Sequence, residues 1–350
     1  MSSIRINDED RQEQLRMLVE SAAGIAPRQG GFKRQRTLEK SDTGFDRGAW
    51  AELAGMGWLG LRLSEDAGGM GLGMLEYAVL AAEAGAALLP EPFIEAQLAI
   101  DVMGAETPAE ALSGERLILP AWSFAADGTD IAGGVTVQGD RLSGEKRFVP
   151  LAAAADELLV TTAEGGWLVA AADTEITTER TQDGGHVGRV RLDGVAGRRI
   201  PFADPRAFDA ATLANAACLL GVMERAFEIT LDYLKTRRQF DRPIGSFQAL
   251  QHRAVEMKVQ IEITRAVIRD TALAFDGDGD VRAAVSRAMT RASEAAQFVT
   301  RQAIQMHGAI GYTDEADIGL FLRKTLVLMN RYGSASTHRK RHAETHAEAA

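Results

Sequence analysis

The spacing of hydrophobic residues divides the chain into three segments. In the first, which ends near residue 111, hydrophobic residues recur at helical spacing, as at Trp50, Leu53 and Ala54. Between about residues 115 and 201 the pattern changes to short hydrophobic runs separated by turn residues, which is typical of strands. Helical spacing then returns and continues almost to the end of the chain. The pattern predicts a helical N-terminal domain, a central β domain and a C-terminal helical domain.

The central segment is predicted to form a small antiparallel β domain. Turn residues at 138–140 and 164–166 separate neighbouring runs in the manner of hairpins. The expected strands cover about residues 117–119, 134–137, 157–160, 167–169 and 187–192.

The C-terminal segment is predicted to form a four-helix bundle, because long helices with one broad hydrophobic face ordinarily pack side by side in antiparallel order. Pro201 and Pro205 mark its start, and the polar tail after Arg339 is expected to fray. The expected helices cover about residues 206–237, 246–275, 281–307 and 318–332. The predicted domains are therefore residues 1–114, 115–204 and 205–350.

Composition and charge exclude several classes of protein. Hydrophobic residues make up 46% of the chain and charged residues 25%, an ordinary balance for a protein with a substantial core. The formal net charge of −10 gives no general attraction to nucleic acid or anionic lipid. Cys218 is the only cysteine, no uninterrupted hydrophobic run reaches about 18 residues, and the polar start from Met1 to Asp10 lacks the apolar core of a signal peptide. We expect a cytoplasmic protein that binds neither nucleic acid nor a membrane.

Two motifs in the C-terminal segment carry the most specific information. The chain reads RRQFDRPIGSFQ from Arg237 to Gln248 and QMHGAIGYT from Gln305 to Thr313. Taken singly, the arginine pair could simply compensate a helix dipole, and the glycines could form an ordinary helix C-cap. Taken together, at this separation, the two motifs resemble the C-terminal helical domain of the acyl-CoA dehydrogenases. The N-terminal stretch from Ala54 to Gly71 is also similar to that family, although Ser64 stands where proline is usual.

The resemblance covers nearly the whole chain, from about Phe45 to Arg341, and it implies an activity. Members of the family carry FAD and oxidise an acyl-CoA thioester to the 2,3-enoyl thioester. A carboxylate base removes the α-proton while the β-hydride passes to the flavin. The flavin ring lies between the β domain and the helical bundle, and a neighbouring subunit holds the adenylate end. The usual electron acceptor is electron-transferring flavoprotein.

The resemblance also assigns cofactor-binding residues. Arg237 matches an arginine that would pair with the FAD pyrophosphate, for which a guanidinium is well suited. Asp241 and Ala309 each replace a glycine of the family pattern, and Asp241 adds a negative charge near the phosphates. The other implied cofactor-binding residues are Gln239, Phe240, Phe247, Gln248, Gln305, Gly308, Ala309 and Gly311, with Phe148 and Val149 in the β domain.

The catalytic carboxylate of the family is missing from both of its known positions. The common position falls in Tyr332-Gly333-Ser334-Ala335-Ser336, where Gly333 replaces the glutamate. A minority of the family carries the glutamate on the first bundle helix, where a gap-free match places Ala211 and, at the adjoining arginine, Thr212. Asp209 is the nearest carboxylate by sequence and a weak candidate for a relocated base. A stabilising charge at a helix N-terminus is its more ordinary role.

The flavin-facing segments of the β domain also depart from the family pattern. The family's Thr-Glu-Pro…Gly-Ser-Asp loop corresponds to residues 120–125, which read PAWSFA. The family's Trp-Ile-Thr segment has become Phe148-Val149-Pro150, so Pro150 has lost both a hydroxyl and a backbone N–H that could face the flavin.

Three hypotheses account for these losses. In the first, the chain is the less catalytic subunit of a hetero-oligomer, contributing Arg237, Gln248 and Gln305 to FAD held mainly by an unlike acyl-CoA dehydrogenase subunit. Such pairs often degrade the acyl-CoA esters of sterol side chains, aromatic acids or dicarboxylic acids. In the second, it is a homodimeric or homotetrameric dehydrogenase with a relocated base. In the third, it is a cofactor-free scaffold or regulatory relative.

Two further features have simpler interpretations. His338, His342 and His346 recur every four residues, as metal ligands on one helix face can. They fall in the tail that is expected to fray, with no acidic cluster beside them, so no metal site is expected. Cys218 lies in a hydrophobic helical run and is predicted to be a small buried side chain rather than a nucleophile.

Overall fold

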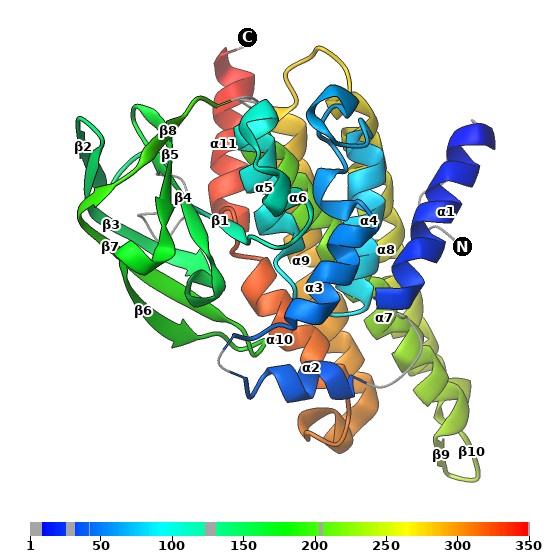
Figure 1. The fold of residues 1–350 in the computed structure, drawn as a ribbon. Coiled ribbons are helices and arrows are strands. Elements are labelled where there is room, and N and C mark those ends of the chain that lie inside the picture. The colour runs from blue at the N-terminus through cyan, green and yellow to red at the C-terminus, as the bar shows by residue number, and fades with distance from the viewer. Residues whose placement is uncertain (1–8, 26–31, 42, 123–130, 203–205, 349–350) are drawn as a thin grey trace. The chain divides into compact units, whose positions relative to one another are not determined.

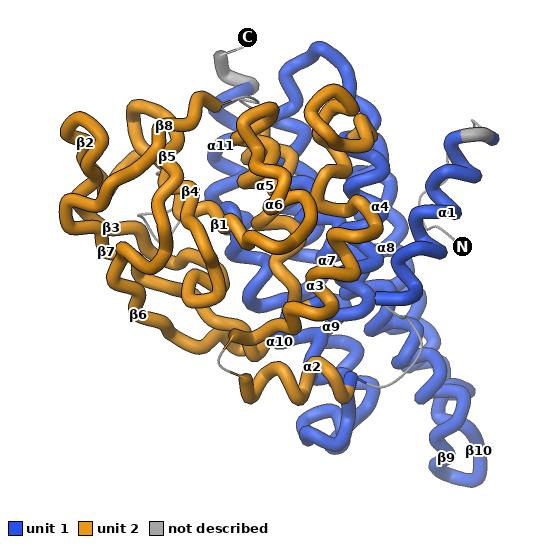
Figure 2. Tube along the Cα trace, in the orientation of Figure 1, with its two compact units in different colours: residues 1–32, 74–89, 213–350 blue, residues 33–73, 90–212 orange. Residues whose placement is uncertain are grey.

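The computed structural model describes residues 9–25, 32–41, 43–122, 131–202 and 206–348 (Figure 1). The chain divides into two compact units, which differ in colour in Figure 2. Unit 1 comprises residues 1–32, 74–89 and 213–350, and unit 2 comprises residues 33–73 and 90–212. Pro205 and residues 123–125, on which parts of the prediction rest, lie outside the described residues.

The described residues of unit 1 are helical apart from one short hairpin. Its described elements are α1 (Glu9–Ile25), α4 (Met74–Ala86), most of α7 (Ala207–Thr236), β9 (Arg238–Gln239), β10 (Arg242–Pro243), η6 (Ile244–Ser246), α8 (Gln248–Phe275), α9 (Arg282–His307), η7 (Gly308–Tyr312), α10 (Ile318–Leu328) and α11 (Ala335–Glu348). Helix α9 shows how the sequence forms this core, because Val285, Met289, Ala292 and Ala296 recur every three or four residues and are all buried.

Glycines let two helices of unit 1 approach each other closely. A Cβ atom built on Gly221 of α7 would lie 1.8 Å from the Ala82 carbonyl oxygen of α4. A Cβ on Gly85 of α4 would lie 2.0 Å from the carbonyl oxygen of Cys218 on α7. No larger residue fits at either position without moving a backbone. Cys218 itself is buried, as the sequence predicted.

Unit 2 combines short helices with two sheets. Its described helices are α2 (Lys33–Leu38), α3 (Arg47–Gly55), η1 (Trp58–Gly60), η2 (Glu65–Ala67), α5 (Phe93–Met103), η3 (Gly104–Glu106), α6 (Ala109–Leu112), η4 (Ala152–Ala154) and η5 (Ala171–Asp173), with the first residues of α7. Its described strands are β1 (Ile118–Ala121), β2 (Val135–Gln138), β3 (Arg141–Pro150), β4 (Glu157–Thr162), β5 (Gly165–Ala170), β6 (Glu175–Arg180), β7 (His186–Ala196) and β8 (Arg198–Ile200).

The strands form two four-stranded sheets, in the orders β1-β4-β5-β8 and β2-β3-β7-β6. Both predicted hairpins are present: Gln138 pairs with Arg141, and Thr162 pairs with Gly165. The antiparallel β domain is confirmed with one exception, because β1 pairs with β4 in parallel. Parallel pairing needs a long connection, and 35 residues separate Ala121 from Glu157 in the sequence.

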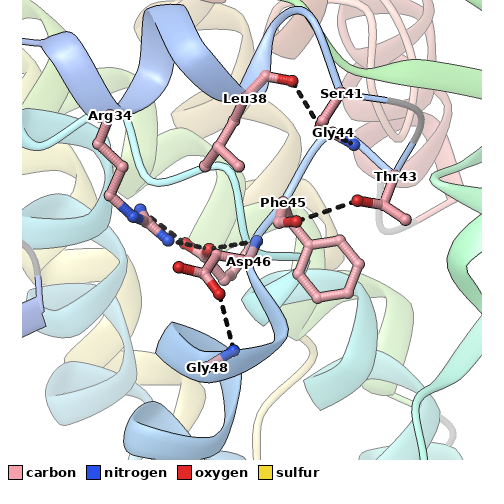
Figure 3. A network of polar contacts seen from close by, with 9 residues as sticks. Arg34, Leu38, Ser41, Thr43, Gly44, Phe45, Asp46 and Gly48 are labelled. Carbon is pink, nitrogen blue, oxygen red and sulfur yellow. Dashed lines mark hydrogen bonds and ion pairs between the residues drawn. The ribbon is translucent and has the colours of Figure 1, made fainter.

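A network of polar contacts, in which Figure 3 labels Arg34, Asp46 and Gly48, holds the N-terminal part of unit 2 around a buried carboxylate. Glu91 forms an ion pair with Arg34 and also accepts a hydrogen bond of 3.2 Å from the backbone N–H of Asp46. The Asp46 side chain in turn caps α3 by accepting a hydrogen bond from the N–H of Gly48. This network fixes the chain where it enters α3.

The bundle helices begin and end close to their predicted residues, but the C-terminal tail differs from the prediction. Residues 335–348 form α11 rather than a frayed segment. Arg341 donates to Ser286 over 2.6 Å, and the ring of His342 contacts the Ala283 carbonyl, so α11 packs on α9. The tail was expected to fray because it is polar, whereas these long-range contacts hold it in place.

Helix α7 is long and hydrophobic enough to cross a membrane by length and composition alone. However, 94% of the 18-residue hydrophobic stretch of this helix is buried inside the structure. That burial is typical of a core helix and is consistent with a soluble protein. The division into domains 1–114, 115–204 and 205–350 stays a prediction.

Candidate functional site

The first motif forms the end of α7 and the hairpin that follows it. Arg237 lies directly after α7, and β9 and β10 pair through Gln239 and Arg242. Phe240 and Asp241 form the two-residue turn between them, with φ angles of +51° and +62°. Such a turn requires positive φ at both central residues, which explains why the family prefers glycine at the position of Asp241. Aspartate tolerates this conformation better than most residues.

The hairpin and the residues that flank it carry several aromatic rings and guanidinium groups. The Arg242 guanidinium lies 4.1 Å from the centre of the Phe247 ring. The Phe240 ring meets Phe247 edge-on and is 85% exposed. Arg237 and Arg238 are also exposed. The hairpin therefore presents positive charge and a large apolar ring to the outside of this chain.

The second motif forms the end of α9 and the turn that follows it. Gln305 is exposed in the last turn of α9, and Gly308 ends the helix with φ of +68° and ψ of −145°, a conformation that essentially only glycine adopts. A Cβ on Gly311 would lie 2.8 Å from the Ile304 carbonyl oxygen, so this glycine is also required. Ala309 is exposed beside Gly308. The turn leaves the Gly308 backbone open to a ligand.

Contacts between helices bring the two motifs together. The ring of Tyr233, one turn before Arg237, stacks on His307 with 4.4 Å between ring centres. Gln248 opens α8, and farther along that helix Arg253 donates to Gln302 of α9 over 2.6 Å. The end of α7, the start of α8 and the end of α9 therefore lie together.

It was not predicted from the sequence that a contact between Tyr233 and His307 would bring the two motifs together. The signal was present, because Tyr233 stands four residues before Arg237 on one helix and His307 lies inside the second motif. Burial lowers the pKa of His307, and the Ala303 carbonyl, 2.7 Å from Nδ1, opposes that shift only in part. A neutral ring with its proton on Nδ1 suits both this contact and the stack on Tyr233.

The residue predicted to stand at the family's main base position is a glycine, Gly333. Gly333 is buried between α10 and α11 with φ of +112°, and Tyr332 before it has φ of +61°. His338 follows in α11, 1% exposed. Burial, and to a lesser extent the nearby Arg341, lowers the pKa of His338 to about 4.

The alternative base position lies near the start of α7, in unit 2. Ala211 is buried there, and the adjoining Thr212 donates its hydroxyl to the Phe208 carbonyl over 2.7 Å. Asp209 is 6% exposed in the first turn of α7, where a carboxylate interacts favourably with the helix dipole. This geometry fits the structural role of Asp209 and leaves its role as a base untested.

The predicted β-domain residues lie in β3, also in unit 2. Phe148 is 41% exposed with φ of +56°, at a point where the register between β3 and β7 shifts. The side chain of Val149 is 1% exposed, and Pro150 pairs with Val187 at the end of the strand. Phe148 is thus the accessible member of the pair that was predicted to contact the flavin.

Within the described part of the chain, no group of three or more histidine, cysteine, aspartate or glutamate side chains is arranged to hold a metal ion. His338 is buried in α11, and His342 contacts the Ala283 carbonyl. The side chain of His346 lies outside the described residues.

Comparison with known proteins identifies the family. Residues 12–106 match the model of the acyl-CoA dehydrogenase N-terminal domain, and residues 205–346 match that of the C-terminal domain. Acyl-CoA dehydrogenase IpdE2 of Mycobacterium tuberculosis is 31% identical over 314 residues, which cover 89% of this chain and 91% of that protein. The chain belongs to the acyl-CoA dehydrogenase family.

A second relative comes from M. tuberculosis, and several solved structures are also similar to this chain. Acyl-CoA dehydrogenase FadE27 of M. tuberculosis is 31% identical, and the match covers 80% of this chain and 82% of that protein. A chain of a Tcur3481-Tcur3483 steroid ACAD variant superposes with a TM-score of 0.87 at 31% identity, covering 97% of this chain and 99% of that one. A chain of the M. tuberculosis ChsE4-ChsE5 complex superposes with a TM-score of 0.85 at 28% identity, with 98% of each chain covered. The predicted fold is thereby confirmed.

Proposed function

We propose that this chain is the less catalytic subunit of a hetero-oligomeric, FAD-dependent acyl-CoA dehydrogenase. One observation carries the proposal. By the sequence resemblance the two family base positions fall on Gly333 and Ala211, neither of which carries a carboxylate, while the residues predicted for the adenylate end of FAD lie together at one end of the unit 1 helices. The chain would complete a cofactor site whose base belongs to an unlike subunit.

The residues of unit 1 fit the phosphate-bearing end of FAD. Arg237 and Arg238 are exposed cations, and Gln248 and Gln305 are exposed amides close to them in the fold. Gly308 has open space around the position of a Cβ, so its backbone can approach a phosphate closely. When bound, FAD supplies the hydride acceptor for the dehydrogenation. The role of this chain is to bind and orient the nucleotide tail by charge-assisted hydrogen bonds.

The relatives support a substrate class and a kind of partner. The matched solved structures include a steroid ACAD and a complex of two differently named chains, ChsE4 and ChsE5. We therefore assign a steroid or lipid acyl-CoA thioester to the assembled enzyme, and a second acyl-CoA dehydrogenase subunit as the partner. Electron-transferring flavoprotein is the proposed electron acceptor, and the cytoplasm the proposed location.

The decisive experiment compares the purified chain with the chain co-purified with an unlike subunit that retains the family glutamate. The chain alone should be colourless and inactive on steroid acyl-CoA thioesters. The mixed complex should show flavin absorbance and dehydrogenate the substrate. Stoichiometric flavin and rapid turnover in the isolated chain would overturn the proposal and point to a relocated base such as Asp209.

Arg237→Met tests the binding role directly. In the mixed complex it should weaken FAD binding by about tenfold to a hundredfold, because a charge-assisted hydrogen bond contributes roughly 1.5–3 kcal/mol. Lys235→Met is a matched control, since Lys235 is an exposed cation two residues away that forms an ion pair with Asp232. Equal losses in both variants would show that general charge, and not the position of Arg237, holds the cofactor.

A further inference from the structure

Lys146 is a buried lysine in the β domain, and the proposed function has no role for it. It lies in β3 with 0% of its surface exposed. Its ammonium group donates to three backbone carbonyls, those of Gly133 at 2.7 Å, Ile131 at 3.1 Å and Trp122 at 3.3 Å. A buried charge is costly unless hydrogen bonds compensate it, so these contacts are expected to be strong.

The three carbonyls come from the two sides of one connection between β1 and β2. Trp122 directly follows β1, and Ile131 and Gly133 precede β2. The Thr161 hydroxyl of β4 also donates to the carbonyls of Trp122 and Ile131, and it is buried too. Lys146 and Thr161 thus join the two sides of this connection from neighbouring strands, through acceptors that no side-chain substitution removes.

Lys146 and Thr161 contact the Trp122 backbone carbonyl, and the Trp122 ring in turn packs on the start of α7. Trp122 is 4% exposed, and its ring meets the Phe208 ring edge-on, with 6.4 Å between centres. Phe208 is in the first turn of α7, next to Asp209 and three residues before Ala211. A chain of contacts within unit 2 therefore runs from the Lys146 ammonium through Trp122 to the part of α7 that holds the alternative base position.

We propose that Lys146 is a positioning residue, a tethered cation whose charge holds Trp122 and, through it, the start of α7. This role does not rest on the proposed function, in which the unlike subunit holds the flavin ring. A lysine that merely filled space could be replaced by any chain of similar volume. A tethered cation can be replaced only by another cation.

The first experiment needs neither FAD nor a partner. The full chain is labelled with 5-fluorotryptophan, and the Trp122 resonance is assigned with Trp122→Phe. In Lys146→Met, which keeps most of the volume, the Trp122 resonance should shift or broaden while those of Trp50 and Trp58 stay in place. An unchanged Trp122 resonance would overturn the proposal. Lys340→Met is the matched control, because the Lys340 side chain is 80% exposed, and it should change none of the resonances.

Chemical rescue separates charge from packing. Propylammonium carries the atoms from Cγ to Nζ that Lys146→Ala lacks, so it should restore the wild-type Trp122 resonance in a saturable manner. Propanol, of similar size and without charge, should not. Equal recovery with both compounds would show that Lys146 acts by packing and would refute the tethered-cation role. If Lys146→Ala does not fold, Thr161→Val provides the second test: it removes one donor to the Trp122 and Ile131 carbonyls and should shift the same resonance by a smaller amount, whereas no shift contradicts the proposal.

The complex with the unlike subunit separates this role from the proposed function. Because the unlike subunit holds the flavin ring in that proposal, Lys146→Met should leave the visible spectrum of the bound flavin unchanged. If no flavin complex forms even with the wild-type chain, the proposed function fails, while the fluorine measurements still decide the role of Lys146.

Discussion

Gly333 has a backbone conformation that glycine adopts more readily than any other residue. Its φ of +112° lies in a region that L-residues rarely adopt, and glycine adopts it without strain. A glutamate at this position would need a different backbone between α10 and α11. The backbone at this predicted base position therefore favours glycine, and Gly333→Glu is not expected to restore a base there.

His338 gives a prediction about pH. Its pKa is about 4 in the folded chain against an ordinary value of 6.5, so below pH 6.5 the unfolded chain binds the additional proton. The stability that comes from the neutral ring is complete above pH 6.5 and decreases as the pH falls towards about 4. Between pH 7.5 and pH 5 the wild type should lose about 2 kcal/mol more than His338→Leu, as measured by urea unfolding.

His252→Leu is the control for this prediction, because His252 is exposed on α8 and its replacement should leave the loss unchanged. Burial also lowers the pKa values of His186 and His307, so some acid destabilisation should remain in His338→Leu. A His338→Leu variant as sensitive to acid as the wild type would contradict the assignment.

Asp241 gives a second prediction at this scale. It keeps the turn conformation that glycine has in the family, yet it adds a negative charge beside Arg238 and Arg242. Asp241→Asn retains the tolerance of positive φ and removes the charge. In the mixed complex it should tighten FAD binding by about threefold, or roughly 0.6 kcal/mol, the scale of an exposed charge pair. Titration calorimetry would detect this, and weaker binding would show that the Asp241 charge is not facing the phosphates.

At the scale of secondary-structure elements, α4 and α7 depend on two glycines for their close packing. Gly221→Ala places a methyl group 1.8 Å from the Ala82 carbonyl oxygen, so the helices must separate. The free energy of unfolding should fall by about 3 kcal/mol, and Gly85→Ala should have a similar effect. Urea unfolding measures both losses.

Gly279→Ala is the matched control, because no atom lies within 4 Å of the position of its Cβ. It should change stability by less than about 0.5 kcal/mol. Losses in Gly221→Ala no larger than this would mean that the two helices can move apart freely.

Helix α11 shows why one element could not be predicted. Its sequence is polar, with few hydrophobic residues to mark a buried face, and a frayed tail was the natural expectation. Arg341 and His342 instead hold it on α9 through contacts with Ser286 and Ala283, more than 50 positions earlier in the sequence. By contrast α8 and α9 carry a helical hydrophobic period, and their limits could be predicted from the sequence to within a few residues.

At the scale of the whole molecule, the net charge of −10 contrasts with the cationic hairpin. The hairpin guanidinium groups provide a local site for phosphate on an acidic protein. Because that site would be completed by the partner, FAD should stabilise the mixed complex and have little effect on the chain alone.

Thermal unfolding measures this linkage. At a free FAD concentration about one hundred times the Kd, the mixed complex should gain roughly 2.7 kcal/mol. The midpoint for the isolated chain should stay within error across the same titration. A clear rise for the isolated chain would show that it binds FAD without a partner and would favour the homo-oligomeric alternative.

The sequence alone determined the family and the order of helical and β segments, and it predicted that the family's base positions fall on Gly333 and Ala211, without a carboxylate. These features are local, because the hydrophobic period, the turn residues and the motif spacing each depend on residues that are close together in the sequence. The tertiary structure decided that Tyr233 stacks on His307, that Lys146 joins the two sides of the connection after Trp122, and that α11 packs on α9. Each depends on partners far away in the sequence, and only folding determines which of them come within hydrogen-bonding or van der Waals distance.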